Sequence, residues 1–212
     1  MPVAGGTAGA ILAGGESRRF GSPKALATVG GLTIIERIAA AHRSVFAAVV
    51  LVTNEPEHFR HLGLPMVSDL RADAGPLAGI QAALDWAREL GADGVCCTPS
   101  DAPFVDSALF SALLEARAGY DAVLPMSGGP LSFEPLFGWY SRKTLPVLEE
   151  RLAAGEFAVH KFVDRIPRVR RIQVGGANSA LRFLNVNTRD DLELARRQLR
   201  EDLDSTDGAD EG

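Results

Sequence analysis

Continuous apolar runs of strand length alternate along the chain with segments in which apolar positions recur at the spacing of a helix. The runs are rich in Val, Ile, Leu or Ala, and polar or turn residues lie at their ends. Continuous rather than alternating runs predict strands that are buried on both faces. The predicted strands cover residues 7–13, 47–52, 94–98 and 122–126, a segment that ends at Ser68-Asp69, and the short segment 183–186.

The helical segments lie between these strands, and residues that commonly cap helices mark several of their ends. Gly91 and Gly119 follow two of the helices, and Thr188 begins the last one. Strand and helix thus alternate, which predicts an α/β domain with a mostly parallel sheet and right-handed crossovers. The predicted helices cover residues 33–43, 77–90, 106–118, 142–153 and 158–164, and a final helix runs from Thr188 to about Leu203.

The length of the chain limits its domain organisation. Its 212 residues, of which 46% are hydrophobic, suffice for one large core but not for two generous domains. We expect a single domain over residues 1–203, in which residues 134–174 form an insertion or lid-like region. Six of the 27 acidic residues lie in the last twelve positions, which hold no Lys or Arg. Residues 204–212 are therefore expected to form a disordered acidic tail.

Charge and hydropathy exclude several classes of protein. Without its acidic end the chain has 22 basic against 21 acidic residues, so it lacks the basic surface that nucleic-acid binding requires. It has no run of eighteen apolar residues and no signal-peptide pattern, which predicts a cytoplasmic protein that does not enter a membrane. Cys96 and Cys97 are neighbours in a predicted strand, so they should face opposite sides of the sheet and fill the core as thiols.

The loop that follows the first predicted strand is a candidate phosphate site, because ligands of open parallel sheets bind beyond the carboxyl ends of the strands. Glycines let backbone N–H groups approach a phosphate, and cations neutralise its charge. The loop matches neither a Walker motif nor the GxGxxG motif of dinucleotide folds, and a flexible turn with solvated charges is the alternative. It contains Gly14, Gly15, Arg18, Arg19, Gly21 and Lys24.

Polar residues after the other strands complete the candidate site. Asp101 lies between two prolines and suits magnesium, which takes one or two protein carboxylates beside phosphates and water; a turn cap is the alternative. Asp69 ends another strand, and the glycine-flanked helix start at residues 75–79 favours anions. Asn185 and Asn187 face one side of the last predicted strand, either as ligands or as turn and cap residues.

These motifs occur in the same order in one enzyme family, and over about 190 residues the chain resembles the molybdenum cofactor guanylyltransferases of the MobA type. The chain departs from the family at two places. Family members often have Cys-Asp-Thr-Pro or Cys-Asp-Met-Pro around Asp101, and some have an asparagine near Val52, whose place Asn54 takes here. Neither departure removes a charged group. The resemblance lies in Leu12-Ala13-Gly14-Gly15 with Arg19, Gly21 and Lys24, Asp69, Gly75-Pro76-Leu77-Ala78-Gly79, Ser100-Asp101-Ala102-Pro103, and Asn185-Val186-Asn187-Thr188 followed by Asp191-Leu192.

The resemblance implies a three-layer Rossmann-like fold, with helices on both faces of a mostly parallel sheet, as in nucleotide-diphospho-sugar transferases. It implies Mg²⁺-dependent transfer of GMP from GTP to the terminal phosphate of molybdopterin that carries molybdenum, with release of pyrophosphate. Molybdoenzymes or their chaperones are the implied protein partners. The implied nucleotide-binding residues are Leu12, Ala13 and Gly14 at the guanine, Lys24 at the phosphates, Gly15, Asp69, Gly75, Pro76 and Leu77, and Asp101, which also binds the metal; Asn185 and Asn187 contact the acceptor.

The expected reaction needs no activating base, because its nucleophile is an ionised phosphate oxygen. This agrees with a sequence in which no Ser-His-Asp or Cys-His arrangement can be recognised. Arg19, Lys24 and Asp101 are the predicted catalytic residues, through positioning and charge neutralisation without a covalent intermediate. In the resembling families the guanylyl enzymes have glycine and the cytidylyl enzymes alanine at the position of Gly14, which favours GTP. The alternatives are a molybdopterin cytidylyltransferase or other small-molecule nucleotidyltransferase, and a noncatalytic nucleotide- or cofactor-binding adaptor.

Overall fold

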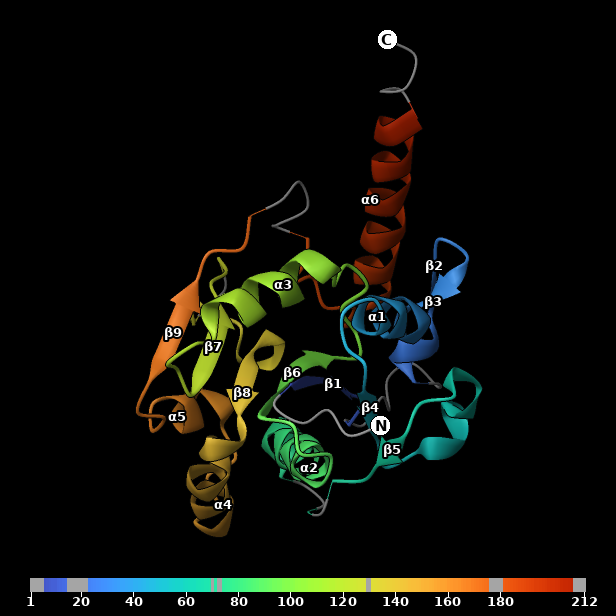
Figure 1. Ribbon diagram of the computed structural model, residues 1–212. Coiled ribbons are helices and arrows are strands. Elements are labelled where there is room, and N and C mark those ends of the chain that lie inside the picture. Colours follow the sequence, from blue (N-terminus) through green and yellow to red (C-terminus); the bar gives the residue numbers. More distant parts are fainter. Residues whose placement is uncertain are drawn as a thin grey trace.

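A seven-stranded sheet lies at the centre of the computed structural model, which describes residues 6–14, 23–69, 71, 74–128, 131–175 and 181–207, with side chains to residue 201 (Figure 1). Its strand order is β5-β4-β1-β6-β8-β7-β9. Neighbouring strands are parallel except at β8, which is antiparallel to both β6 and β7. The strands are β1 (Thr7–Leu12), β4 (Val49–Val52), β5 (Met66–Val67), β6 (Gly94–Pro99), β7 (Ala122–Pro125), β8 (Trp139–Ser141) and β9 (Val169–Ile172), and a separate hairpin joins β2 (Thr28–Val29) and β3 (Leu32–Thr33).

Helices cover both faces of this sheet, which confirms the predicted three-layer α/β fold (Figure 1). One face packs against α1, α3 and the first turns of α6, and the other packs against α2, α4 and α5. The helices are α1 (Ile34–Arg43), α2 (Gly75–Glu89), α3 (Ser107–Ala116), α4 (Leu145–Ala153), α5 (Val159–Val163) and α6 (Arg189–Asp207), with short 3₁₀ turns at Lys24–Leu26, Pro56–His58, Arg60–Leu62, Pro135–Phe137 and Arg142–Thr144.

The two hydrophobic cores follow from the alternation of side chains along each strand. Cys96 packs into the core under α1 and α3, while its neighbour Cys97 packs into the core under α2, α4 and α5. Both are completely buried free thiols, as predicted. The same alternation places Ile11 in the first core and Leu12 in the second, so both faces of β1 are apolar. A strand buried on both faces explains why the sequence shows a continuous apolar run.

The region of residues 134–174 supplies two strands that were not predicted. Strand β8 lies between β6 and β7, and β9 forms the edge of the sheet. The antiparallel β8 approaches β6 so closely that a Cβ at Gly94 would collide with the carbonyl oxygen of Tyr140, so glycine is required there. The predicted strand at 183–186 is wrong: Phe183 ends a turn, and residues 184–186 have no regular secondary structure.

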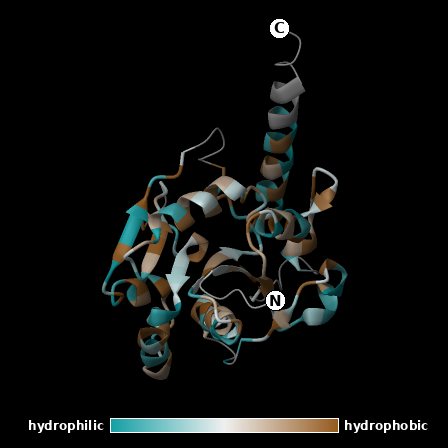
Figure 2. Ribbon diagram, viewed as in Figure 1, coloured by the Kyte–Doolittle hydropathy of each residue, from teal (hydrophilic) through white to brown (hydrophobic). Residues whose placement is uncertain are grey.

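The last helix is longer than predicted and projects away from the sheet (Figure 1). Hydrophilic residues prevail along its described part, with hydrophobic ones at intervals (Figure 2). Leu192 and Ala195 anchor its first turns in the core, and Arg196 donates a hydrogen bond of 3.0 Å to the carbonyl oxygen of Thr28 in the β2–β3 hairpin. Of the helices within the described ranges, none has the length and apolar character of a membrane-spanning segment.

Candidate functional site

Four parallel strands end at the same edge of the sheet. Leu12 at the end of β1 is in register with Val52 of β4 and with Pro99 of β6, and Val52 is in register with Val67 of β5. The hydrogen bonds continue one residue further, from Ala13 N–H to the oxygen of Val52 (2.8 Å) and from Ser100 N–H to that of Leu12 (3.1 Å). The residues after these strands therefore leave the sheet side by side, as expected for a ligand-binding edge.

Gly14 and Asp69 come together at this edge. A Cβ built on Gly14 would lie 3.6 Å from Asp69 Oδ2, in ordinary van der Waals contact. The other oxygen, Oδ1, accepts a hydrogen bond of 2.8 Å from Asn54 Nδ2. Sequence reasoning noted Asn54 only as a substitute for a family asparagine and did not assign it to the site. Its signal was a polar amide two residues after a buried strand, next to Asp69 across the sheet edge.

The predicted metal ligand Asp101 follows β6 directly. Burial raises the pKa of its carboxyl group, and the nearby charge of Lys24 acts in the opposite direction. Its Oδ1 is enclosed by protein and has no hydrogen-bond partner among the described residues. A buried carboxylate oxygen without a donor costs free energy unless it binds a cation or a proton.

The segment before α6 lies beside Asp101. The N–H of Val186 donates a hydrogen bond of 2.8 Å to the backbone oxygen of Asp101, so the Asn185–Asn187 stretch runs along the loop that carries the carboxylate. Asn185 Oδ1 is buried and, like Asp101 Oδ1, has no hydrogen-bond partner in the part of the chain that the structure describes. Two oxygens that could bind a cation thus occur in adjacent segments.

Lys24 reaches the same segment from the other end of the chain. Its Nζ donates a hydrogen bond of 3.0 Å to Asn187 Oδ1. Asn187 is itself fixed by the start of α6, because its N–H and that of Thr188 bond to Asp191 Oδ2, and Asp191 N–H bonds back to Thr188 Oγ1. This reciprocal pair is a helix cap, which confirms the predicted role of Thr188. The hydrogen bond from Asn187 N–H contributes most to a lowered pKa of Asp191.

The start of α2 completes the described part of the edge. Gly75 has φ = 62°, a conformation that glycine adopts without strain, and with Pro76 it is exposed at the first turn. Leu77, in contrast, is fully buried in the core, so its side chain is not available to a ligand. Gly79 lies where α2 packs on the end of β1. A Cβ built on this glycine would be 3.4 Å from Leu12 Cδ2. Gly15 and the predicted catalytic Arg19 lie outside the described residues, as do Arg18 and Gly21.

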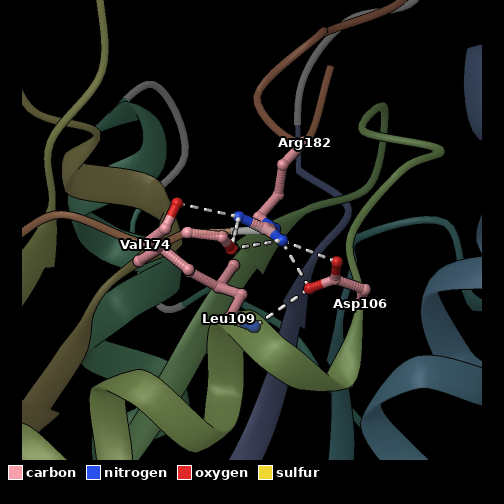
Figure 3. Close-up of polar contacts among 5 residues, drawn as sticks. Asp106, Leu109, Val174 and Arg182 are labelled. Carbon is pink, nitrogen blue, oxygen red and sulfur yellow. Dashed lines mark hydrogen bonds and ion pairs between the residues drawn. The ribbon is translucent and has the colours of Figure 1, made fainter. Parts of the chain in front are cut away.

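Sequence reasoning missed an ion pair behind this edge, between Arg182 and Asp106 (Figure 3). The Arg182 side chain is 1% exposed and binds both carboxylate oxygens of Asp106, at 3.0 and 2.8 Å. The available signal was a single arginine inside the apolar stretch 181–184. A charge in such a position indicates an acidic partner, but the sequence does not identify it.

Comparisons with known proteins identify the family of the chain. Residues 9–169 match the family of the MobA-like NTP transferase domain. A probable molybdenum cofactor guanylyltransferase of Pelotomaculum thermopropionicum is 40% identical over 194 residues, which cover 89% of this chain and 91% of that protein. A molybdenum cofactor guanylyltransferase of Cereibacter sphaeroides is 36% identical over 196 residues, with coverages of 92% and 97%.

Solved structures show the same fold. The molybdopterin-guanine dinucleotide biosynthesis protein A of Archaeoglobus fulgidus has a TM-score of 0.75 and 25% identity, and the match covers 92% of this chain and 100% of that one. The 2-C-methyl-D-erythritol 4-phosphate cytidylyltransferase of Thermus thermophilus has a TM-score of 0.67 at 20% identity, covering 90% and 98%, a likeness of fold alone. The chain therefore belongs to the family of the MobA-like NTP transferase domain and is a nucleotidyltransferase.

Proposed function

We propose that this nucleotidyltransferase transfers GMP from GTP to the terminal phosphate of molybdopterin that carries molybdenum, with release of pyrophosphate. The observation that carries the proposal is the hydrogen bond between Lys24 and Asn187 beside the buried carboxyl group of Asp101. It brings together a cation, an amide and a buried carboxylate oxygen without a donor among the described residues, where the parallel strands end. The names of the two relatives described above, both molybdenum cofactor guanylyltransferases, support the choice of nucleotide and acceptor.

The guanine would bind at the end of β1. The backbone from Leu12 to Gly14 offers N–H and carbonyl groups in fixed positions, because β1 is held between β4 and β6. The carboxylate of Asp69 lies next to Gly14 and is oriented by Asn54. A carboxylate accepts hydrogen bonds only, so it suits the N1–H and amino donors of a guanine edge, or the hydroxyl groups of the ribose.

Magnesium would be held by Asp101. The fit rests on the enclosed Oδ1, which has no donor among the described residues, and on Asn185 Oδ1, a second oxygen of the same kind in the adjacent segment. No cluster of three His, Cys, Asp or Glu side chains occurs in the described ranges, which suits an ion that takes few protein ligands beside phosphate and water. Bound magnesium would supply charge neutralisation on the nucleotide phosphates. The unpaired atom of Asn185 is an oxygen, which cannot donate a hydrogen bond to a phosphate. This oxygen would therefore bind a cation or accept a hydrogen bond.

The reaction follows from the charges that the chain presents. A terminal phosphate oxygen of molybdopterin attacks the α-phosphorus of GTP, the new P–O bond forms, and the bond to the β-phosphate oxygen breaks to release pyrophosphate. The nucleophile is already ionised, so no side chain must accept a proton. Lys24, and Arg19 from outside the described residues, would stabilise the charge that develops on the phosphates. The reaction would take place in the cytoplasm, where GTP is available.

The test is release of pyrophosphate by the wild-type protein from GTP, CTP, ATP or UTP, each with Mg²⁺ and molybdopterin. We expect turnover with GTP, dependence on Mg²⁺ and molybdopterin, and a guanylylated product detected by mass spectrometry. Turnover with CTP in place of GTP would contradict the guanylyl assignment and leave the enzyme class intact. Binding of GTP without pyrophosphate release under any of these conditions would instead favour a noncatalytic cofactor-binding adaptor.

A further inference from the structure

Arg182 is among the largest side chains that the described part of the chain buries completely. Figure 3 shows its guanidinium group between the carboxylate of Asp106 and the carbonyl oxygen of Val174. The carbonyl oxygens of Val174 and Gly175 each lie 3.4 Å from its nitrogens. An arginine fork matches a carboxylate through two parallel hydrogen bonds, which fixes orientation as well as distance. The contact therefore holds the Arg182 backbone at a defined place relative to the start of α3.

Asp106 is equally fixed, because it caps α3. Its Oδ1 accepts a hydrogen bond of 2.9 Å from Leu109 N–H and also binds Arg182 Nε. The residue lies in an extended conformation immediately before Ser107, the first residue of the helix. Asp106 thus joins a rigid helix end to the guanidinium group of Arg182.

A second contact joins the same two segments. The N–H of Val186, four residues after Arg182, donates a hydrogen bond to the carbonyl oxygen of Asp101, five residues before Asp106. The loop from Asp101 to Asp106 is consequently tied to the segment from Arg182 to Val186 at both ends. A hydrogen bond of 2.8 Å from Leu184 N–H to Leu181 O closes a tight turn that contains Arg182. Asn185 and Asn187 flank Val186, so both ties bear on their position.

We propose that the Arg182–Asp106 ion pair is a positioning clamp, which sets the register of Asn185 and Asn187 against Asp101 and Lys24. For the identity of the substrates this inference rests on the proposed function, but the clamp itself does not. Arg182 is a positioning residue, since it is buried behind the site and its guanidinium group is occupied by Asp106 and two carbonyl oxygens. Loss of the clamp leaves the nucleotide-binding ends of β1, β4 and β5 intact and releases the segment that faces the metal and the acceptor.

Two variants test the clamp without removing the cap of α3. Asp106→Asn keeps a good N-cap and removes the charge that pairs with Arg182. The double variant Arg182→Met/Asp106→Ser removes both charges, fills the buried volume of Arg182 with an apolar chain and keeps a hydroxyl cap at the partly exposed position of Asp106. The control is Asp121→Asn, which breaks a similar two-bond contact with Arg168, at 3.0 and 2.9 Å, at the opposite end of β7 from the site.

The first measurement is hydrogen exchange of the Val186 amide in the full chain without substrates. We expect exchange at least about tenfold faster in both clamp variants, through local opening, and no change in Asp121→Asn. The second measurement is the KM for molybdopterin and kcat with GTP as nucleotide. We expect catalytic efficiency toward the acceptor to fall on the order of ten- to a hundredfold, because small displacements of positioned groups have effects of this size, while GTP affinity changes little.

The clamp is overturned if Val186 exchange and the acceptor KM match the wild type in Asp106→Asn at a temperature at which the variant is folded. It is also overturned if Asp121→Asn changes both quantities to the same extent, because the effect would then be general destabilisation. If the double variant does not fold, Asp106→Asn alone decides. Absence of turnover in the wild-type protein would count against the proposed function, and the exchange of Val186 would still decide the clamp.

Discussion

Lys24 Nζ donates a hydrogen bond to Asn187 Oδ1 across 163 positions of the sequence. The bond connects the end of the predicted phosphate loop with the segment that leads into α6. The same ammonium group acts on Asp101, where its charge opposes the effect of burial on the carboxyl pKa. Lys24 therefore lies where a triphosphate, a metal-bound carboxylate and the acceptor segment would meet.

Replacement of Lys24 by alanine should reduce turnover strongly. Because a preorganised cation at the developing phosphate charge is lost, we expect kcat to fall roughly a hundred- to a thousandfold. Asn187→Ala should have a smaller effect, since it removes a neutral amide, the partner of Lys24 and a predicted contact of the acceptor, rather than a charge. The measurement is steady-state pyrophosphate release, with Lys143→Ala as a control. This exposed lysine lies in the 3₁₀ turn after β8, next to the first residue of β6 and therefore at the edge of the sheet opposite the site. Equal rates in wild type and Lys24→Ala would show that the loop has been misinterpreted.

Replacement of Asp101 by asparagine should separate activity from stability. Burial raises the carboxyl pKa, so the folded state holds a proton more tightly than the unfolded state does. This stabilisation is therefore complete below the pKa of an aspartate in the unfolded chain, and it is lost as the pH rises from there through the raised pKa of the folded state. At neutral pH and without magnesium, the neutral asparagine removes this penalty.

We accordingly expect Asp101→Asn to have an equal or higher Tm than the wild type in the absence of Mg²⁺, to lose the stabilisation by Mg²⁺ with GTP, and to lose nearly all turnover. Differential scanning fluorimetry with and without Mg²⁺ and GTP checks the first two expectations, and pyrophosphate release checks the third. In the wild type, metal binding should weaken on acidification at a pH above that expected of an ordinary aspartate. A variant that keeps wild-type activity at low Mg²⁺ would exclude Asp101 as the metal ligand.

Most of the central sheet could be predicted because β1, β4, β6 and β7 are short and buried on both faces, which leaves a continuous apolar pattern. Strand β8 could not be predicted in the same way. Its place between β6 and β7 depends on a close approach to Gly94. This glycine is paired in register with Ser141, which lies 47 residues later in the chain, and the local sequence around β8 does not indicate such a contact. Strand β9 contains two arginines in four residues and is partly exposed at the edge, so its apolar signal is weak.

The candidate site shows the same limit. The common location of Gly14, Asp69 and Asp101 could be predicted because residues that follow buried parallel strands gather at one edge, and the register of Leu12 with Val52 and Pro99 accounts for this. Arg182 could not be paired from the sequence, since its partner Asp106 is 76 positions away. Leu77 shows a different limit: the resemblance implied a contact with the nucleotide, and its side chain is part of the core, which leaves only its backbone for such a contact.

The pH dependence of folding should reveal a neutral histidine in the core. His42 Nε2 lies 2.7 Å from Thr98 Oγ1, and its ring packs against Phe110 with centroids 4.4 Å apart. Its Nδ1 has no hydrogen-bond partner among the described residues. Complete burial lowers the pKa to about 3. Because the unfolded chain binds this proton near pH 6.5, the stabilisation is complete above pH 6.5 and is lost as the pH falls toward 3.

The expected contribution of His42 between pH 7.5 and pH 4.5 is roughly 2–3 kcal/mol of unfolding free energy. Urea unfolding at both pH values should show this loss in the wild type and a correspondingly smaller loss in His42→Leu. Phe46→Leu is a matched control, because its ring lies 5.5 Å from that of His42 and has no titratable group. It should lower stability by a similar amount at both pH values. An unchanged pH dependence in His42→Leu would mean that the folded protein accommodates the charged imidazole.

The choice between GTP and CTP should depend on Gly14. A Cβ there would make an ordinary contact of 3.6 Å with Asp69 Oδ2, so the fold itself accepts alanine and Gly14→Ala should keep the wild-type Tm. The added methyl group would, however, occupy space next to the Asp69 carboxylate, which Asn54 holds in place. A purine needs more of that space than a pyrimidine does. We therefore expect kcat/KM for GTP to fall by on the order of 10- to 200-fold, the range for a steric change in a pocket, and kcat/KM for CTP to change much less.

Turnover with both nucleotides on molybdopterin, in the wild type and in Gly14→Ala, measures the ratio of the two efficiencies directly. If alanine reduces the two efficiencies equally, Gly14 does not select the base, and if the wild type uses CTP as well as GTP, the site does not recognise guanine.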